Sequence, residues 1–305
     1  MIVVTGGEGF IGKNIINQLV KQHVAKPVDI VILDTKYQSL DSIYIWLTEH
    51  VGEIEYIIHM GAITDTTETN NDLLFEHNTG ASMFIWNLCT EHSIPLIYAS
   101  SAATYGNGIN GFDDEKDISF LQPLNAYGWS KQNFDLWCQM EDKTPPHWYG
   151  LKFFNVYGQY ESHKGSMASV VLHAYNQIKT TGKIKLFKSY LKDCEDGEQC
   201  RDFIYVDDVV NTIIYLMEHP PKSGLYNVGT GKARSFNDLA KAVFKSLRIN
   251  EKITYIDMPT KIIQSYQYFT MAKMNKLRSV GCDFKFYELE DGVDEYIKKL
   301  EYENC

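Results

Sequence analysis

The sequence predicts an α/β protein built around a doubly wound parallel sheet, with a smaller α/β domain beside it. Three observations support this fold class. In the first half of the chain, short continuous apolar runs alternate with segments of helical periodicity, which is typical of parallel strands buried on both faces. A glycine-rich turn joins the first of these runs to the first helical segment. The length of 305 residues, 44% of them hydrophobic, suffices for one substantial core and a smaller second one.

The predicted elements alternate in βαβ order along this first half. Strands rich in β-branched and aliphatic residues are expected at residues 2–5, 29–33, 56–59, 96–99 and 151–154. Helices are expected at residues 10–23, 73–92, 126–140, 166–180, 207–218 and 235–247. The first helix has Ile11, Ile15 and Leu19 on one face, and the last two begin at residue types that cap helices, Asp207 and Ser235.

The composition limits the kinds of partner. With 29 Lys+Arg against 39 Asp+Glu the net charge is −10, so a nucleic-acid backbone would be repelled. No apolar run is long enough to cross a membrane and no signal peptide is visible, so we expect a cytoplasmic protein without a membrane partner. The six cysteines form no CxxC, and the close pair Cys194 and Cys200 is expected to be free thiols in an acidic surface loop, the alternative being a disulfide or a metal site there. No metal site is predicted.

The glycine-rich turn lies between the first strand and the first helix. Gly6 permits the sharp turn, Gly9 lets the main chain approach a pyrophosphate, and Gly12 lets the helix pack closely on the strand. The N–H groups and the positive dipole end of the helix would then hold the phosphates without help from lysines. In this context the turn predicts a dinucleotide-binding Rossmann sheet, although the spacing alone would also suit a plain tight turn.

Asp34 ends the second predicted strand, 22 residues after Gly12. An acidic residue at this place usually binds the ribose hydroxyl groups of NAD. Lys36 follows closely and would instead suit the 2′-phosphate of NADP. The choice between NAD and NADP therefore stays open at this point.

Tyr127 and Lys131 form a YxxxK motif, which places both side chains on one face of a predicted helix, one turn apart. The ammonium group of Lys131 is expected to lower the pKa of Tyr127, so that the phenol becomes a base near neutral pH. Ser100 and Ser101 follow a buried strand, at the sheet edge where such folds bind ligands. A serine there would hydrogen-bond a reacting substrate oxygen; the alternative is that one of the two caps a turn.

The glycine turn, the serines and the YxxxK motif resemble those of the extended short-chain dehydrogenases/reductases, the NAD-dependent epimerase/dehydratase family that acts on nucleotide sugars. Residues 153–158 (FFNVYG) and 201–209 (RDFIYVDDV) extend the resemblance. Residues 162–169 (SHKGSMAS), with residues 100–106 and 266–270, are similar to members that epimerise C6″ of a nucleotide-linked heptose. The resemblance covers nearly the whole chain.

The resemblance implies a redox epimerisation that converts ADP-D-glycero-β-D-manno-heptose into its L-glycero epimer. A hydride would leave C6″ for a tightly bound NADP or NAD and return to the other face of the ketone, so the cofactor is recycled. By the family pattern Tyr127 and Lys164 are the acid/base groups for the two faces, and Ser101 hydrogen-bonds the reacting oxygen. Lys131 would contact the nicotinamide ribose. A homo-oligomer, with a pentamer as one form, is also implied.

The family's binding residues carry over position by position. Those implied to bind the cofactor are Gly6, Gly9, Phe10, Ile11, Gly12, Asp34, Thr35, Lys36, Gly61, Ala62, Ile63, Asn78, Lys131, Val156 and Lys164. Those implied to bind the nucleotide-diphosphate heptose are Ser101, Asn155, Ser166, His173, Phe187, Arg201 and Tyr266. The planar guanidinium group of Arg201 suits a diphosphate, whereas His173 and Phe187 lie in segments that would be partly buried in any case.

The chain is expected to divide unevenly, without a visible linker. Residues 1–158 would form the dinucleotide-binding domain, with residues 202–225 returning to it. Residues 159–201 and 226–305 would form mainly the substrate-binding domain. The substrate lobe would then fold around one edge of the cofactor sheet.

Two departures from the family pattern bear on specificity. The segment between Asp34 and Tyr56 is short, although it usually surrounds the adenine and reaches the 2′-phosphate. The acidic loop at residues 191–200 is long and would border the nucleotide pocket, where it would affect which nucleoside diphosphate is accepted.

Two alternative functions stay open. The first is another nucleotide-sugar epimerase, dehydratase or reductase; a dehydratase would place a carboxylate beside the serine, and residues 101–104 offer none. The second is a non-catalytic cofactor-binding protein on the same fold. The complete set of Ser101, Tyr127, Lys131 and Lys164 counts against it.

Overall fold

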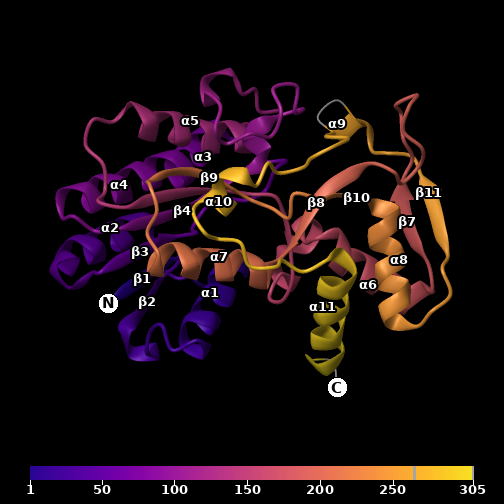
Figure 1. Cartoon of the computed structure of the whole chain (residues 1–305), viewed down its shortest axis with the longest axis horizontal. Coiled ribbons are helices and arrows are strands. Elements are labelled where there is room, and N and C mark those ends of the chain that lie inside the picture. Colours follow the sequence, from indigo (N-terminus) through magenta and orange to yellow (C-terminus); the bar gives the residue numbers. More distant parts are fainter. Residues whose placement is uncertain (264–265, 304–305) are drawn as a thin grey trace.

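The computed structural model describes residues 1–263 and 266–303. Its main sheet has six parallel strands in the order β2-β1-β3-β4-β5-β9 (Figure 1). These strands are β1 (Ile2–Thr5), β2 (Ile30–Leu33), β3 (Tyr56–His59), β4 (Leu96–Ser101), β5 (Trp148–Phe153) and β9 (Gly224–Val228). The order reverses between β1 and β3, and sheets of this type bind ligands at such a switch point. The predicted doubly wound Rossmann fold is therefore confirmed.

Helices cover both faces of the main sheet (Figure 1). On one face α1 (Phe10–Lys21) packs beside α7 (Val206–Glu218). The other face carries α2 (Leu40–Glu49), α3 (Asn71–Leu74), α4 (Ala81–Glu91) and α5 (Ala126–Met140). The strands are sealed between these layers, as the complete burial of Val3 and Ile58 shows. This burial on both faces explains why the strands appear in the sequence as continuous apolar runs.

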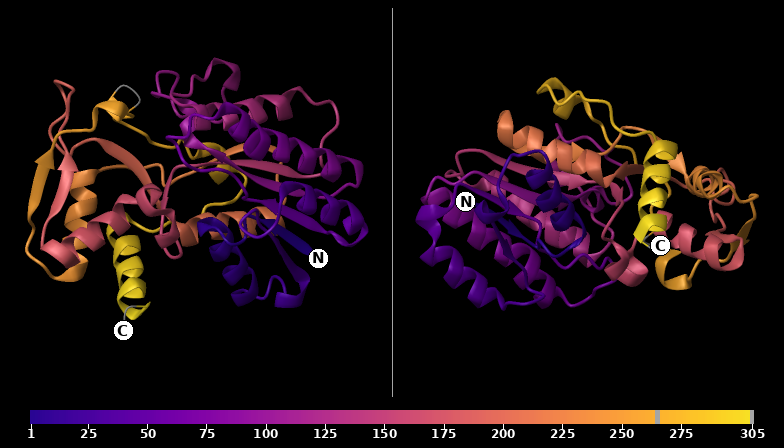
Figure 2. Two further views of the ribbon diagram at one scale, coloured as in Figure 1. Left: turned by 180° about the vertical axis from the view of Figure 1, so that it is seen from behind. Right: turned by 90° about the horizontal axis from the view of Figure 1, so that it is seen from below.

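The rest of the chain forms a second group of elements beside the main sheet. Its three-stranded sheet consists of β10 (Ala233–Ser235), β8 (Cys200–Tyr205) and β6 (Asn155–Tyr157), with β8 in the middle. A separate pair is formed by β7 (Ile184–Phe187) and β11 (Ile253–Ile256). The helices of this group are α6 (Val170–Thr181), α8 (Phe236–Leu247), α9 (Thr260–Ile263) and α11 (Leu289–Glu303), whereas α10 (Asn275–Ser279) packs against β9 of the main sheet. Figure 2 shows the two groups side by side from behind and from below.

Capping side chains fix where several helices begin. Ser39 accepts the Ser42 N–H before α2, and Asn125 accepts the Gly128 N–H, at 2.8 Å, before α5. Such a cap contributes about 1 kcal/mol to helix stability. The cap at Asn125 also determines where α5 begins, and therefore which residues lie one and two turns into this helix.

The predicted elements agree well with the observed ones in the first half. The strands at residues 2–5 and 56–59 and the helix at residues 126–140 are confirmed at both ends. The helix expected at residues 73–92 is instead α3, a π-helical stretch over Phe75–Gly80, and α4 in succession. Helix α2 is not predicted, because it buries only Ile43 and Leu47 and its periodicity is therefore weak. No strand is expected at β6, β7, β8, β9, β10 or β11, so these six strands are likewise missed.

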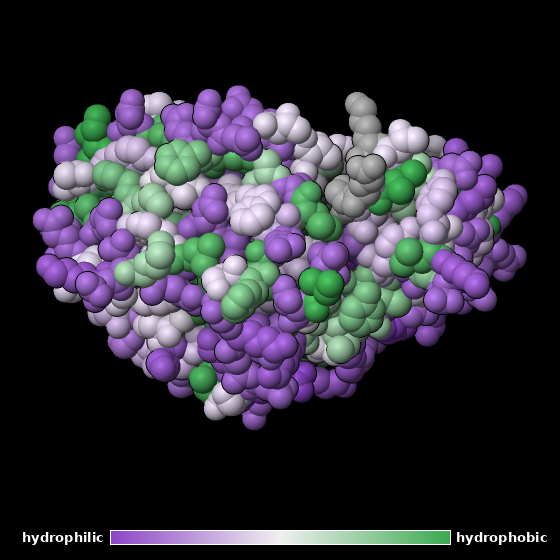
Figure 3. Space-filling model, turned by 90° about the horizontal axis from the view of Figure 1, so that it is seen from above, coloured by the Kyte–Doolittle hydropathy of each residue, from purple (hydrophilic) through white to green (hydrophobic). Residues whose placement is uncertain are grey.

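Hydrophilic residues cover most of the face seen from above, with hydrophobic residues scattered among them (Figure 3). No helix among the described residues is long and apolar enough to cross a membrane. Five cysteines are free thiols, and Cys305 lies outside the described residues. Residues 1–263 and 266–303 contain no cluster of three or more His, Cys, Asp or Glu side chains that could hold a metal ion.

Candidate active site

A cleft of about 900 Å³ follows the carboxyl ends of β1, β3, β4 and β5, on the side of the second group of elements. Of the sequence-predicted site residues, it is lined by Gly6, Gly9, Phe10, Ile11, Gly12, Asp34, Thr35, Lys36, Gly61, Ala62, Ser101, Tyr127, Lys131, Asn155, Val156, Lys164 and Ser166. The predicted residues that are not part of this lining are Ile63, Asn78, His173, Phe187, Arg201 and Tyr266. The fold therefore brings the acid/base groups and the glycine turn together in one cavity.

The glycine turn has a shape that larger residues would destroy. Gly6 adopts a φ of +64°, and a Cβ atom there would lie 2.6 Å from the Cα of Gly61. A Cβ atom on Gly12 would lie 2.2 Å from the carbonyl oxygen of Gly6. Gly9 precedes α1 without a side-chain cap, so no side chain of the cap residue occupies the first N–H groups of the helix. These donors line the cleft and suit an anionic group such as a pyrophosphate.

Asp34 is held in place at the cleft by the main chain. Its carboxylate accepts the N–H groups of Glu8, at 3.0 Å, and of Lys36, at 2.9 Å. The ammonium group of Lys36 lies 4.9 Å from the centre of the exposed Tyr37 ring. Asp34 is thus a fixed hydrogen-bond acceptor where Rossmann folds bind the ribose.

Asn78 supports the cleft from behind. This buried residue accepts the Ile63 N–H at 2.8 Å and donates to the Ile63 oxygen at 3.0 Å and to the Ser130 hydroxyl at 2.9 Å. Asn78 therefore connects the loop after β3 with α5. Below it, His59 Nδ1 and the Thr5 hydroxyl are 2.6 Å apart, and burial lowers the pKa of this imidazole to about 3.

The reaction centre combines residues of α5 and β4. A hydrogen bond with Ser101 favours ionisation of Tyr127, but burial outweighs it and raises the pKa of Tyr127. Lys131 Nζ donates to the Ala99 oxygen at 2.9 Å, and burial lowers the pKa of Lys131 to about 8. The lowered pKa expected for Tyr127 is therefore not found in this structure, because Lys131 is engaged with the main chain and the phenol is desolvated.

Lys164 reaches the same cleft from the short helical segment Ser162–Met167. Its ammonium nitrogen lies 5.5 Å from the centre of the Phe10 ring, next to the glycine turn. Burial lowers the pKa of Lys164, and nearby Glu161 opposes this effect. The sequence contains no local reason for a lowered pKa here, and the tertiary structure supplies one.

Arg201 lies between aromatic rings of the second group of elements. The guanidinium carbon is 5.1 Å from the centre of the Tyr266 ring and 5.6 Å from that of Phe236, and Phe187 meets Tyr266 edge-on at 6.4 Å. Within the described residues no carboxylate forms an ion pair with Arg201, although the side chain is only 7% exposed. Its guanidinium group donates to the Cys200 oxygen at 2.9 Å and lies outside the lining of the cleft.

The cleft is also lined by residues that the sequence did not single out individually, among them Gln267 and Thr270. Gln267 and Thr270 lie in the loop that follows the undescribed residues 264–265. Gln267 Nε2 donates to the Gly106 oxygen and so connects this loop to the end of the short helical turn that follows β4. Their only signal in the sequence is their place in the segment 266–270, which supports the family resemblance.

The predicted substrate residues near the cleft are joined by local contacts. His173 Nε2 lies 3.3 Å from the Ser166 oxygen, which links α6 to the segment that carries Lys164. The long loop at residues 191–200 is anchored by Gln199, which donates to the Lys188 oxygen at 3.2 Å. Tyr190 at its base donates its N–H to the Tyr268 hydroxyl at 3.1 Å, so the loop is attached to the segment of Tyr266.

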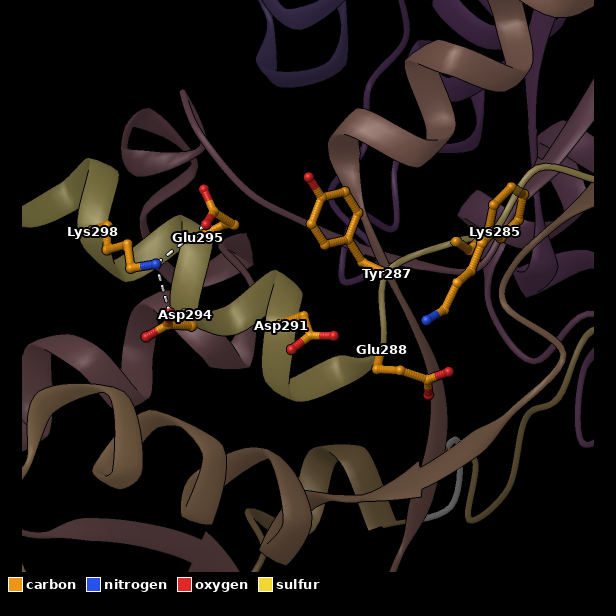
Figure 4. A pocket seen from close by; sticks show the side chains of 8 residues that line it. Lys285, Tyr287, Glu288, Asp291, Asp294, Glu295 and Lys298 are labelled. Atoms are coloured by element: carbon orange, nitrogen blue, oxygen red, sulfur yellow. Dashed lines mark hydrogen bonds and ion pairs between the residues drawn. The ribbon is translucent and has the colours of Figure 1, made fainter.

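A second pocket, of about 430 Å³, lies beside the start of α11 and shares no residue with the cleft. Acidic side chains dominate it, and Lys298 pairs with Asp294 at 2.8 Å and with Glu295 at 3.3 Å (Figure 4). It lacks an arrangement of nucleophile, base and anion-binding donors. We therefore place the candidate active site in the cleft.

Known proteins are similar to this chain over its whole length. The model of the NAD dependent epimerase/dehydratase family matches residues 2–229. The ADP-L-glycero-D-manno-heptose-6-epimerases of Fusobacterium nucleatum and Nitratidesulfovibrio vulgaris are 45% and 43% identical, each over 98% of this chain and 97% of the relative. The crystal structure of the ADP-L-glycero-D-manno-heptose-6-epimerase of Helicobacter pylori matches with a TM-score of 0.79 at 29% identity, over 98% of this chain and 96% of that chain.

Proposed function

The chain belongs to the NAD dependent epimerase/dehydratase family, and from this premise we propose that it inverts C6″ of an ADP-linked heptose. The substrate is ADP-D-glycero-β-D-manno-heptose, and the product is its L-glycero epimer. The observation that carries the proposal is the single cleft lined by Ser101, Tyr127, Lys131 and Lys164. A redox epimerase needs such a set, because a proton must be handled on either face of one carbon.

The inversion proceeds by oxidation of the C6″ alcohol to a ketone and reduction from the opposite face. Tyr127 takes the hydroxyl proton on one face as its phenolate, a form that burial disfavours and the hydrogen bond with Ser101 favours, while Ser101 also contacts the reacting oxygen. A nicotinamide nucleotide, when bound, supplies the acceptor and then the donor of the hydride. Rotation about the exocyclic bond presents the other face to Lys164, whose ammonium group returns a proton. Tyr127 and Lys164 then exchange protons with water, so no net oxidation occurs.

The residues at the glycine turn fit a dinucleotide. The close approach at Gly12 and the uncapped start of α1 leave room and donors for two phosphates. The cofactor is NADP or NAD, tightly bound and recycled. Asp34 favours the ribose hydroxyls of NAD, whereas Lys36 would suit a 2′-phosphate. Identification of the nucleotide released from the purified, denatured protein distinguishes the two.

The second group of elements contacts the nucleotide diphosphate. Arg201 binds the diphosphate through its planar guanidinium group, and Phe187 and Tyr266 contact the nucleoside. Asn155, Ser166 and His173 complete the substrate side. The long loop at residues 191–200, which is anchored to the same segment as Tyr266, restricts the nucleoside that is accepted.

Further expectations concern the whole molecule. Residues 1–158 with 202–225 form the dinucleotide-binding domain, and residues 159–201 and 226–305 mainly the substrate-binding domain. The protein acts in the cytoplasm, which suits its free thiols. It assembles as a homo-oligomer, with a pentamer as one form.

One experiment tests the proposed reaction directly. The purified protein is incubated with ADP-D-glycero-β-D-manno-heptose without added cofactor, and the configuration at C6″ is followed by NMR. We expect inversion to equilibrium without net reduction of nucleotide. If bound nucleotide is present and C6″ keeps its configuration, the proposed function is wrong and another nucleotide sugar is the substrate.

A further inference from the structure

A fully buried ion pair lies directly behind the reaction centre. Asp135 follows Lys131 by one turn and Tyr127 by two turns on α5, so the three side chains share one face of the helix. The Asp135 carboxylate lies 2.6 Å from the ammonium group of Lys152 on β5, and both side chains are inaccessible to solvent. Such burial is rare, because removing each charge from water is costly. No step of the proposed reaction uses either residue.

Hydrogen bonds connect this pair to the end of β4, which carries Ser101. Ser100 Oγ donates to the Asp135 carboxylate at 2.6 Å, and Lys152 Nζ donates to the Thr104 hydroxyl at 2.7 Å. The Thr104 hydroxyl donates in turn to the main-chain oxygen of Ser101 at 2.8 Å. The pair therefore holds the strand end through residues on both sides of Ser101.

The same pair also sets the electrostatic environment of Lys131, because the Asp135 carboxylate lies one helical turn away from it. The Asp135 carboxylate favours the ammonium form of Lys131 and opposes ionisation of Tyr127. Without a partner of its own, Asp135 would attract Lys131, which lies one turn away on the same face. That attraction would pull Lys131 away from the Ala99 oxygen and the cleft. Lys152 meets the carboxylate at hydrogen-bond distance and so prevents this.

The other titratable groups around Asp135 cannot replace Lys152. The Tyr98 hydroxyl donates to Asp135 at 3.1 Å, and Tyr105 and Cys138 also face the carboxylate. Burial raises the pKa of all three, so they are neutral at physiological pH. His59, which faces Lys131 from β3, is neutral because burial lowers its pKa to about 3. Lys152 is thus the cation that balances the carboxylate.

We propose that Asp135 and Lys152 are positioning residues for the reaction centre. Lys152 satisfies the carboxylate and thereby leaves Lys131 directed at the cleft. The hydrogen bonds of the pair fix the strand end that presents Ser101. The inference rests on the proposed function, since it takes Ser101, Tyr127 and Lys131 as the groups that meet substrate and cofactor.

Lys152→Met is the first test, because it keeps much of the side-chain volume and leaves the carboxylate unpaired. We expect kcat for C6″ inversion to fall about 100-fold, as displacement of a reacting group does. The Kd of NADH, measured by fluorescence titration, should change less than about threefold, because Lys152 does not line the cleft. A folded Lys152→Met protein with the kcat of the wild type would overturn the proposal.

A second variant separates charge from packing. Asp135→Asn combined with Lys152→Met removes both charges. We expect the kcat of this double variant to be at least about tenfold higher than that of Lys152→Met. Lys152→Arg keeps the charge and should recover activity as well. If the double variant is no more active than Lys152→Met, the unpaired carboxylate is not the cause and the proposal is wrong.

A titration of Lys131 gives a readout that needs no substrate. In protein labelled with ¹³C at the lysine Cε atoms, the Lys131 signal is identified by its loss in Lys131→Arg. We expect the pKa of Lys131 to rise by about one unit in Lys152→Met and to return in the double variant. An unchanged pKa of Lys131 would contradict the inference. If ADP-heptose is not converted by the wild type, the proposed function fails while this titration still decides the role of the pair.

Two controls guard against a general loss of structure. Leu47→Ala removes a fully buried side chain of α2 and should destabilise the protein without moving kcat or the Lys131 titration. A shift in Leu47→Ala equal to that of Lys152→Met would overturn the proposal. Should Lys152→Met fail to fold, Thr104→Val removes the hydroxyl that joins Lys152 to Ser101 and leaves the ion pair with Asp135 in place. It should lower kcat about tenfold at unchanged KM, and an unchanged kcat would contradict the positioning role.

Discussion

The two sides of the cleft are built from different parts of the chain. On the side of β1 the main chain forms the surface, because Gly6 and Gly12 allow close approaches that a Cβ atom would prevent. Beside the opposite side, and outside the lining of the cleft, individual side chains from distant segments meet, as when Arg201 lies between Tyr266 and Phe236. A surface made of main chain depends on local sequence, whereas a surface made of side chains depends on the packing of remote elements.

The difference between the two sides also explains how an acidic protein would hold two diphosphates. The net charge of −10 opposes binding to polyanions. The main-chain side needs no cation, since N–H groups and the helix dipole provide the attraction. The side-chain side needs one cation, and Arg201 is buried beside the cleft without a carboxylate partner in the described part of the chain. Diphosphate binding on each side can therefore be weakened separately by a substitution.

Tyr127→Phe should have the largest effect on kcat, because the side-chain side of the cleft acts through single atoms. Loss of one oxygen removes the base for one face of C6″, and kcat should fall about 10⁴-fold. The affinity for the nucleotide, which binds at the glycine turn on the main-chain side, should be unchanged. Inversion is measured by NMR and bound nucleotide by absorbance. A variant that loses nucleotide together with activity would show that the two halves are not independent.

Lys164→Met removes the proposed acid/base group for the other face. We expect a loss of about 10³-fold in kcat, with the methionine retaining the contact to the Phe10 ring. Single-turnover experiments that follow C6″ by NMR provide the measurement. Wild-type rates in Lys164→Met would refute the assignment of two acid/base groups.

Gly12→Val tests the main-chain half. The new side chain would collide with the Gly6 oxygen, 2.2 Å from the position of Cβ, and the turn must deform. Affinity for the nucleotide should fall about 100-fold, a loss of about 3 kcal/mol. Gly52→Ala is the matched control, because a Cβ atom there meets nothing within 4 Å. Equal affinities of Gly12→Val and the control would speak against a phosphate site at the turn.

Arg201→Lys should weaken only the side-chain half. Lysine keeps the charge but loses the planar group that stacks between two rings, so KM for the ADP-heptose should rise about tenfold. We expect kcat and the Kd of the nucleotide cofactor to stay near the wild-type values. Initial rates over a range of substrate concentration provide the measurement. A drop in kcat at constant KM would instead place Arg201 in the chemical step.

The smallest expected effect is a change with pH. Burial lowers the pKa of Lys131 to about 8, so this group loses its proton as the pH rises through that value. Because burial raises the pKa of Tyr127, the fraction of this base that is ionised grows with pH, and if the charge of Lys131 assists Tyr127, kcat should stop rising near pH 8. The dependence of kcat on pH between 6 and 9.5 tests this. In Lys131→Arg, whose guanidinium stays protonated, the rise should continue past pH 8.

The sequence predicts the two sides of the cleft unequally well. The spacing of Gly6, Gly9 and Gly12 places the turn, and the spacing of Tyr127 and Lys131 places both on one face of α5. For Arg201 the sequence offers only a charge of suitable chemistry, and its aromatic neighbours Phe236 and Tyr266 are far away in the chain. Asn78 is similar, because its role behind the loop of Ile63 depends on the π-helical stretch that periodicity does not reveal.

The sequence by itself determined most of the βαβ alternation in the first half of the chain, the glycine-rich turn and the helix that carries Tyr127 and Lys131. These features depend on contacts between near neighbours in the chain, such as helical spacing, caps and turns. Only the tertiary structure decided the burial that raises the pKa of Tyr127 and lowers that of Lys164. It also brought Asp135 to Lys152 across two elements. Desolvation and ion pairing depend on how remote segments pack, and no local pattern records that.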